Sequence, residues 1–452
     1  MNEIIINSAE QKLAKSLTIK TISQQDPSNV DVEQFKAFHE FLQEAFPLIH
    51  KHLTREFVNN FSLLYTWKGS VSSLKPAIFL AHIDVAPISP GTEGDWEHPP
   101  FEGIIDEKFI WGRGTLDCKG FLISIMEAVE HLLTENYKPK RTIYLGFGHD
   151  EEVGGWEGAY NIARLLKLRD VQAEYVIDEA GFIVDGEPLN VNKPIAAIGI
   201  AEKGRLNLKL QVRGDGGHSS MPPRHTTISI LSSAIENLEK KQFPSRLHEI
   251  ILKTFSHLSP EMPRSLRFVF KNKWLFGKLI KHTLSTIKAM NAMIRTTSAP
   301  TIIEGGTMDN VIPQKASAIV NFRMLPGDSI DYITSQVKKK IKNPRVEIIK
   351  IGRAWEASPI SSIQSVGFNI LKQTLEENFP ETVLAPFLVI GGTDAKHYAK
   401  LSDSVYRFGP LRVGKDDQER AHGTNERIER NNFEECIQFY MAMIRNSDII
   451  EN

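Results

Sequence analysis

The stretch that says most about the fold is "RTIYLGFGHDEEVGG" at residues 141–155. Its first half is an apolar run typical of a buried strand, and its second half is charged and ends in two glycines. Two other runs have the same form, "AIFLAHIDV" at 77–85 and "AEYVIDEAG" at 173–181. Between them lie helical patterns, notably at 118–136. This alternation predicts an α/β domain with a mainly parallel sheet.

Charged residues gather where each predicted strand ends. Ligands of open α/β sheets bind beyond the carboxyl ends of the strands, so these residues are candidates for a site. They are His82, Asp84, Asp150, Glu151, Glu152, Asp178 and Glu179. The three consecutive carboxylates at 150–152 repel one another, so this turn is either a solvated acidic loop or part of a cation site.

A second domain is predicted to start at about residue 203. From there, strand patterns at 203–214, 316–325 and 345–351 and helix patterns at 226–241 and 329–343 suggest the order β-α-β-β-α-β. This order predicts a small ferredoxin-like α+β domain. We therefore expect a catalytic domain made of 1–202 and 353–452, into which 203–352 is inserted.

Within the inserted domain, a helical insertion is expected at about 246–299, and it is unusually basic. From Arg246 to Arg295 there are ten Lys or Arg but only two acids, Glu249 and Glu261. Aromatic residues and methionines are scattered among them. Such a segment can contact a membrane surface or an acyl chain. The alternative is a solvated helical insertion whose apolar face packs on the same chain.

Composition excludes several classes of protein. The 452 residues are 41% hydrophobic and 24% charged, as in soluble globular proteins, and the formal net charge of -1 gives no sign of nucleic-acid binding. Cys118 and Cys436 are the only cysteines, so a disulfide framework is not expected. Since no secretory signal pattern or membrane-spanning run is recognisable, a cytoplasmic protein is expected.

Several of these residues together could form a hydrolytic metal site. Such a site needs nitrogen or oxygen ligands, an open position for water, and a base that is not a ligand. His82 can bind a metal while Asp84 orients it, since alternate residues of a strand share a face. The adjacent Glu151 and Glu152 point differently, so one can bind metal and the other accept a proton. Taken singly, each has an ordinary structural explanation, such as a solvated turn or a surface histidine.

The motifs in combination resemble those of one enzyme family. They are "HID", "GRGTLDCKG", "DEEVGG", "DEAG", "GGHSS", "GGTMDNVIP", "GGTDA" and "HGTNERI". Over roughly residues 10–445 the chain is similar to the dizinc metallopeptidases that include carboxypeptidase G, aminoacylase, acetylornithine deacetylase and carnosinase. "DWEHPPFEG", "AEKG", "GHSSMPP" and the basic insertion are most similar to the carboxypeptidase S and N-fatty-acyl amino acid hydrolase branch. The resemblance implies a zinc-exopeptidase-like catalytic domain, and it implies that the inserted ferredoxin-like domain serves as a lid or a dimerisation domain.

The resemblance also implies two Zn²⁺ per chain, although Co²⁺ or Mn²⁺ would suit the same nitrogen and oxygen ligands. Asp117 would bridge the two ions. The other implied ligands are His82 and either Asp178 or Glu179 for one ion, and Glu152 and His422 for the other. Glu151 would be the general base, and Asp84 would orient His82. 

Further residues are implied to act on the substrate. His218 would stabilise the tetrahedral oxyanion, usually from across a dimer interface, so a homodimer is allowed. The residues implied to grip the substrate's carboxylate are Asn310, Arg323, Gly392 and Thr393. Cys118 departs from the closest branch, where a second Asp often follows the bridging one. Its thiol is either a redox-sensitive or adventitious ligand, or a small packing residue.

The expected function is hydrolysis of the amide bond of N-acyl amino acids, or of the C-terminal peptide bond of short peptides. A water held between the metals would attack the carbonyl, and Glu151 would take its proton. The substrate would be a small molecule with a free carboxylate, and the basic insertion favours a long acyl group. The main alternative is a carboxypeptidase S-like dipeptidase. A non-catalytic metal-binding scaffold is a remote alternative, since it would not need Glu151.

Overall fold

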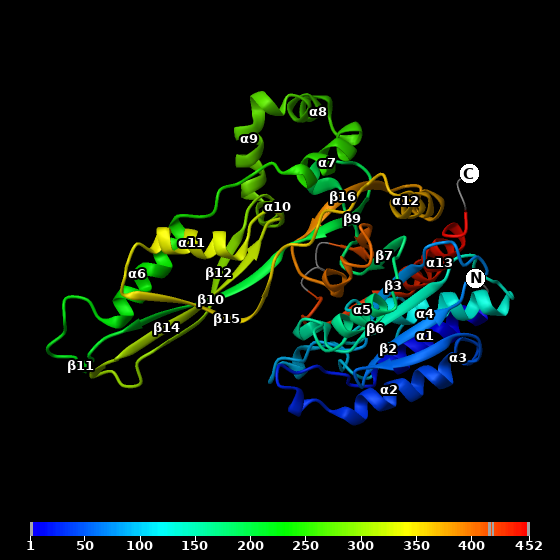
Figure 1. Ribbon diagram of the computed structural model, residues 1–452, viewed down its shortest axis with the longest axis horizontal. Helices are drawn as coiled ribbons and strands as arrows, with labels where there is room; N and C mark the ends of the chain where they lie inside the picture. The colour runs from blue at the N-terminus through cyan, green and yellow to red at the C-terminus, as the bar shows by residue number, and fades with distance from the viewer. Residues whose placement is uncertain (1–2, 415–416, 418–419, 450–452) are drawn as a thin grey trace.

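The computed structural model describes residues 3–414, 417 and 420–449. Figure 1 shows a large α/β body and, beside it, a smaller body built on a separate sheet. The large sheet runs in the order β1-β2-β6-β3-β7-β17-β9-β8-β18, and β16 also pairs with β9. Its strands are β1 Thr54–Val58, β2 Ser62–Trp67, β3 Ala77–His82, β6 Ile143–Gly148, β7 Tyr175–Asp178, β8 Ile183–Val184, β9 Ile195–Glu202, β16 Val383–Val389, β17 Val405–Arg407 and β18 Arg412–Val413.

The middle of this sheet is parallel, because β3 pairs in parallel with both β6 and β7, and β7 with β17. All six residues of β3 are buried, which explains why its sequence is a continuous apolar run rather than an alternating one. Alternate side chains enter different cores. Phe79 packs in the larger core and Ile78 in the smaller one on the opposite face.

Helices cover both faces of the large sheet. The larger core contains side chains from most of them, whereas α5 contributes to the smaller core. The helices are α1 Glu3–Leu17, α2 Val32–Ala45, α3 Pro47–His52, α4 Lys119–Thr134, α5 Ala159–Leu168, α12 Val366–Asn378 and α13 Arg430–Asn446. None of the helices in the described part of the chain is long and apolar enough to cross a membrane.

The smaller body has the β-α-β-β-α-β order expected from the sequence. Its elements are β10 Gly204–Arg213, α6 Thr227–Lys240, β12 Thr297–Gly305, β14 Lys315–Met324, α11 Ile330–Ile341 and β15 Val346–Trp355. The antiparallel sheet has the order β12-β14-β10-β15, and α6 and α11 share one core with it. The predicted fold class, an α/β domain with an inserted ferredoxin-like domain, is confirmed. β15 continues past residue 352, where we placed the end of this domain.

Four helices occupy the insertion between α6 and β12. They are α7 Glu249–Leu258, α8 Arg264–Lys271, α9 Lys273–Thr286 and α10 Lys288–Ile294. Because β12 already begins at Thr297, the last residues of the expected helical insertion belong to the sheet. Two small sheets complete the fold: β11 Gly217–His218 with β13 Val311–Ile312, and β4 Ile104–Ile105 with β5 Phe109–Trp111 and β19 Arg427–Glu429.

Gly120, near the start of α4, supports the turn that carries Asp117. A Cβ at this position would lie 2.1 Å from the backbone oxygen of Thr115. Replacing a helical glycine by alanine ordinarily stabilises a protein, whereas here the backbone would have to move. We expect Gly120→Ala to lower the free energy of unfolding by about 1–3 kcal/mol in urea titrations.

The matched control for this substitution is Gly94→Ala, because a Cβ there would meet nothing within 4 Å. It should leave the urea midpoint close to the wild-type value. A Gly120→Ala protein that is as stable as the wild type would show that this turn does not depend on the absence of a side chain.

Candidate active site

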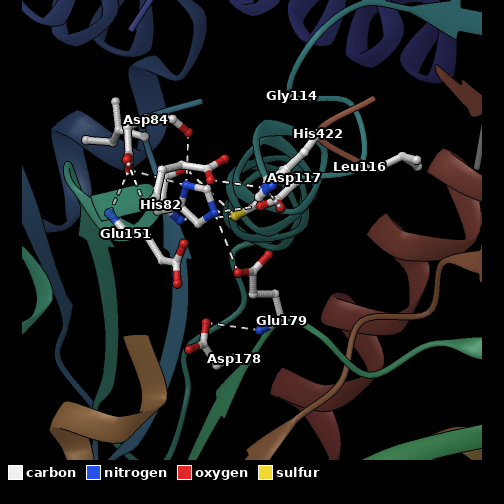
Figure 2. A network of polar contacts seen from close by, with 12 residues as sticks. His82, Asp84, Gly114, Leu116, Asp117, Glu151, Asp178, Glu179 and His422 are labelled. Atoms are coloured by element: carbon white, nitrogen blue, oxygen red, sulfur yellow. Dashed lines mark hydrogen bonds and ion pairs between the residues drawn. The ribbon is translucent and has the colours of Figure 1, made fainter. Parts of the chain in front are cut away.

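The ends of three neighbouring strands bring the candidate residues together. β3 lies between β6 and β7 and is parallel to both, so their carboxyl ends meet at one edge of the sheet. His82 is the last residue of β3, and Asp178 is the last residue of β7. A single 3₁₀ turn, Glu151–Val153, follows β6. The predicted gathering of these residues is therefore present (Figure 2).

Asp117 lies at the centre of the site, in the turn that precedes α4. Its Oδ1 is 2.8 Å from Nε2 of His82, and its Oδ2 is 2.8 Å from Nε2 of His422. Each imidazole also faces a second carboxylate. The distance from His82 Nε2 to Glu179 Oε1 is 3.5 Å, and that from His422 Nε2 to Glu152 Oε2 is 3.0 Å. Asp117 thus joins two groups of nitrogen and oxygen donors.

The geometry distinguishes the two acids at the end of β7. Asp178 uses both carboxylate oxygens locally, because Oδ1 accepts the N–H of Glu179 at 3.0 Å and Oδ2 accepts the N–H of Ala395 at 2.6 Å. Figure 2 shows the carboxylate of Glu179 directed towards His82 and that of Asp178 below it. Between the two alternatives, the arrangement favours Glu179 as the ligand and gives Asp178 a structural role.

Asp84 contacts His82, although not for the reason expected from the sequence. The expectation that both lie on one face of a strand is wrong, because β3 ends at His82. Asp84 instead lies in the following turn, with Oδ1 3.3 Å from Nδ1 of His82. Its two oxygens also accept the backbone N–H groups of Glu151 and Glu152, each at 3.1 Å. The backbone oxygen of Asp84 lies closer to the same Nδ1, at 2.9 Å, so Asp84 positions the imidazole through both groups and the acidic turn through its carboxylate.

The carboxylates of the site lie in an environment that opposes their charge. Burial raises the pKa of Glu151 well above its usual value, and burial together with the charge of Asp117 raises the pKa of Glu179 to about 8. Loss of solvent also opposes the charge of the half-buried Asp117, but its bonds to His422 and His82 outweigh this effect and lower its pKa. Bound cations would offset this repulsion and favour the ionised carboxylates.

The donor sets fit metal ions. One set is His82, Cys118 and Glu179, and the other is Asp117, Glu152 and His422; within each, the donor atoms lie within 4.8 Å of one another. Oε1 of Glu152 is buried and has no hydrogen-bond partner among the residues described, so it is available to a ligand. Imidazole and carboxylate donors suit Zn²⁺, and also Co²⁺ or Mn²⁺.

Cys118 lies within reach of a metal but also fills the protein interior. Its side chain is fully buried in the larger core, and its sulfur accepts the backbone N–H of His82 at 3.1 Å. Burial raises the pKa of the thiol well above its usual value, which opposes formation of the thiolate that binds metals. These contacts agree with a packing residue.

Three of the four proposed substrate-binding residues lie together at the junction of the two domains. Arg323 is on β14, and a Cβ at Gly392 would be 3.9 Å from its Nη1. The charge of Glu151 acts on Arg323 and raises its pKa, although burial of the guanidinium dominates and lowers it. Thr393 donates its backbone N–H and its hydroxyl to Oε2 of Glu202, at 3.2 and 2.8 Å. Glu202 therefore fixes the glycine loop.

The structure of one chain does not bring His218 and Asn310 to this site. Both are exposed, and they lie beside each other at the β11–β13 ribbon. There the backbone N–H of Ser219 donates to the backbone oxygen of Asn310 at 3.0 Å. Figure 1 shows this ribbon at the end of the inserted domain that is farthest from the large sheet. The roles of these two residues therefore stay predictions that require a second chain.

Sequence reasoning missed Glu426, which binds the backbone of the turn that carries Asp117. Glu426 is fully buried, and its Oε1 accepts the backbone N–H groups of Gly114, Leu116 and Asp117 at 3.0, 2.8 and 3.2 Å. Its other oxygen pairs with the guanidinium of Arg113. Both residues occur inside motifs quoted above, "HGTNERI" and "GRGTLDCKG", but the letters alone do not show that they meet.

We expect Glu426→Ala to weaken metal binding by about 10–100-fold, because the turn that holds Asp117 loses its acceptor and Arg113 loses its partner. Titration with a chromophoric chelator would measure this affinity. Glu429→Ala is the control, since Glu429 is half exposed and, among the described residues, its ion pair is with Lys108 on the surface. Wild-type metal affinity in a folded Glu426→Ala protein would contradict the positioning role.

Comparisons with known proteins identify the family of this chain. A family model described as "Peptidase family M20/M25/M40" matches residues 78–446. A probable carboxypeptidase S-like 2 from Dictyostelium discoideum is 42% identical over 443 residues, which are 97% of this chain and 85% of the relative. N-fatty-acyl-amino acid synthase/hydrolase PM20D1.1 from Danio rerio is 38% identical, again over 97% of this chain and 85% of the relative.

A solved structure shows the same fold at low sequence identity. The M20 family metallo-carboxypeptidase Sso-CP2 from Sulfolobus solfataricus superimposes with a TM-score of 0.72 at 19% identity, over 100% of both chains. The resemblance predicted from the motifs is therefore confirmed at the level of the family and of its carboxypeptidase S-like and N-fatty-acyl amino acid hydrolase relatives. The chain belongs to peptidase family M20/M25/M40 and is a metallohydrolase that acts on amide bonds.

Proposed function

We propose that the protein is a two-zinc hydrolase that cleaves N-acyl amino acids. The observation that carries this proposal is the position of Asp117, whose two oxygens each face a different histidine and carboxylate pair. His82, Asp117 and Glu179 would hold one ion, and Asp117, Glu152 and His422 the other. Bound zinc would polarise the substrate's carbonyl group and lower the pKa of the attacking water.

Glu151 is the proposed general base. Its backbone is fixed by Asp84, and its carboxylate belongs to neither donor set; Figure 2 shows it below His82 and to the left of Glu179. A carboxylate whose pKa is raised above its usual value can take a proton from water and return it to the leaving amine. Glu151 would therefore act first as a base and then as an acid.

Arg323 is the proposed partner of the substrate's carboxylate. It lies at the domain junction next to Gly392, and a guanidinium can bind a carboxylate with two parallel hydrogen bonds. An N-acyl amino acid and a short peptide both present a free carboxylate beside the scissile bond, so this contact suits either. The two relatives are named after these two kinds of substrate, since one is called carboxypeptidase S-like and the other N-fatty-acyl-amino acid synthase/hydrolase. The basic insertion favours the N-acyl amino acid, and a carboxypeptidase S-like dipeptidase is the second candidate.

A homodimer is also part of the proposal. His218 and Asn310 are exposed on the ribbon formed by β11 and β13, far from the site of their own chain, where a second chain could receive them. An imidazole N–H from the partner would then stabilise the oxyanion of the transition state. A cytoplasmic location, expected from the sequence, stays a prediction.

The role of Glu151 can be separated from metal binding. Glu151→Gln keeps the shape of the side chain but removes its basicity, so we expect two zinc ions per chain by mass spectrometry and a loss of amidase activity of about 10²–10⁴-fold. Glu107→Gln, at an exposed position, is the control and should keep both properties. Full activity in Glu151→Gln, or no metal in the wild type, would refute the proposed site.

The substrate class can be decided by comparing the rates at which the enzyme hydrolyses two compounds. We expect kcat/KM for N-oleoyl-phenylalanine to exceed that for the dipeptide Gly-Leu, because the apolar residues of the insertion would contribute binding energy for a long acyl chain. Product release followed by chromatography measures both rates on one enzyme preparation. The reverse order would support the dipeptidase and exclude the preference for acyl chains.

A further inference from the structure

The helical insertion is fixed to the protein at its two ends and projects in between. At one end, α7 buries Ile250, Phe255 and Leu258, and the hydroxyl of Thr254 donates to the backbone oxygen of Pro386 in β16 at 2.6 Å. At the other end, Nζ of Lys203 donates to backbone oxygens of α10 and the residue after it. Figure 1 shows α8 and α9 beyond these anchors, at the edge of the molecule.

The two projecting helices expose large apolar side chains. Trp274 is 82% exposed, and Phe268, Leu275 and Leu279 are each more than half exposed. No side chain of α8 is fully buried, whereas Ile280 and Leu284 attach α9 to the rest of the insertion. Single exposed apolar residues are common on protein surfaces, but a cluster of this kind marks an interaction surface.

The same surface is positively charged throughout. Between residues 264 and 288 the sequence has seven Lys or Arg and no Asp or Glu. They are Arg264, Arg267, Lys271, Lys273, Lys278, Lys281 and Lys288. Arg267 donates to the backbone oxygens of Ser259 and Pro260, and none of the seven takes part in an ion pair with a described residue. The charge of this surface is therefore available to an anionic partner.

Apolar and cationic side chains are interleaved on α9. Trp274, Lys278 and His282 follow one another at intervals of four residues, and Leu275 and Leu279 lie beside them. Residues at this spacing share one face of a helix. A helix face with Trp and Leu among lysines is typical of segments that lie in the interface of a bilayer, where the rings enter the headgroup region and the lysines meet anionic lipids.

We propose that α8 and α9 dock the protein onto an anionic lipid bilayer. The positive charge favours a bilayer over a second copy of the same surface, because two such surfaces would repel each other. The contact is peripheral, with Phe268, Trp274, Leu275 and Leu279 entering the interface. This docking does not depend on the proposed substrate or on the metals.

A competing occupant is a single amphiphile. A cavity of about 390 Å³ lies beneath the same helices, and among its lining residues are Ile251, Phe255, Phe270, Arg267 and Lys271. A monomeric fatty acid would place its chain against the apolar wall and its carboxylate near the cations. Its binding would be independent of a bilayer, which makes the two occupants distinguishable.

Sedimentation with lipid vesicles tests the proposal on the full-length protein. The wild type should bind vesicles that contain phosphatidylserine and bind pure phosphatidylcholine at least about tenfold more weakly. The triple variant Lys271→Gln, Lys273→Gln, Lys278→Gln should lose at least about tenfold in affinity for the anionic vesicles. The variant Trp274→Ala, Leu275→Ala should also lose binding, since it removes the part that enters the interface.

Two control variants and a fold check accompany these changes. Lys338→Gln, Lys339→Gln, Lys350→Gln removes three exposed lysines on α11 and β15, outside the helical insertion, and Leu168→Ala removes an exposed leucine of α5. Both should bind vesicles as the wild type does. Circular dichroism and thermal unfolding should be unchanged in all variants, because the altered residues are exposed.

Three outcomes would overturn the proposal. One is absence of binding to anionic vesicles. Another is stoichiometric binding of oleate without binding to vesicles, which would show that the helices serve to bind a single fatty acid in the cavity. The third is a concentration-dependent dimer that the Trp274→Ala, Leu275→Ala variant abolishes, which would assign the surface to a second copy.

Discussion

The site depends on the carboxylate of Asp117, which is shared between His82 and His422. The two histidines are far apart in the sequence and come from a strand end and a distant loop. The carboxylate faces both because it has two oxygens, each 2.8 Å from one of the imidazoles. The turn that carries Asp117 is in turn held by Glu426, which comes from the same distant loop as His422. Asp117, from the first part of the catalytic domain, is thereby linked to His422 and Glu426, from the second part.

The parallel sheet positions these side chains precisely, but it also brings together carboxylates whose burial destabilises the fold. It delivers His82, Glu151 and Glu179 to one edge, where burial raises the pKa of both glutamates. A cluster of buried carboxylates with few cationic partners destabilises a fold unless positive charge is bound there. The family is metal-dependent, and the donor atoms here have the chemistry for metal ions. Of the acidic turn at 150–152, Glu152 belongs to one donor set, whereas the two oxygens of Asp150 accept the backbone N–H groups of Glu157 and Gly158.

Much of the fold was predictable, because β3, β6 and β7 are apolar runs that end in charged residues. The contacts were less so. The choice between Asp178 and Glu179 depends on the N–H of Ala395, which lies far along the chain. Glu426 was missed because a buried glutamate that accepts backbone N–H groups looks in sequence like any glutamate of a polar loop. His218 was predicted from resemblance alone, and the fold of one chain does not supply its surroundings.

The central claim is that Asp117 bridges two metal ions. Crystals of the protein as purified with zinc, measured on both sides of the zinc absorption edge, would test it directly. The account predicts two anomalous peaks about 3.5–4 Å apart, one beside His82 and Glu179 and the other beside Glu152 and His422, with Asp117 between them. A single peak, or a peak bound by the sulfur of Cys118 in place of Asp117, would contradict it.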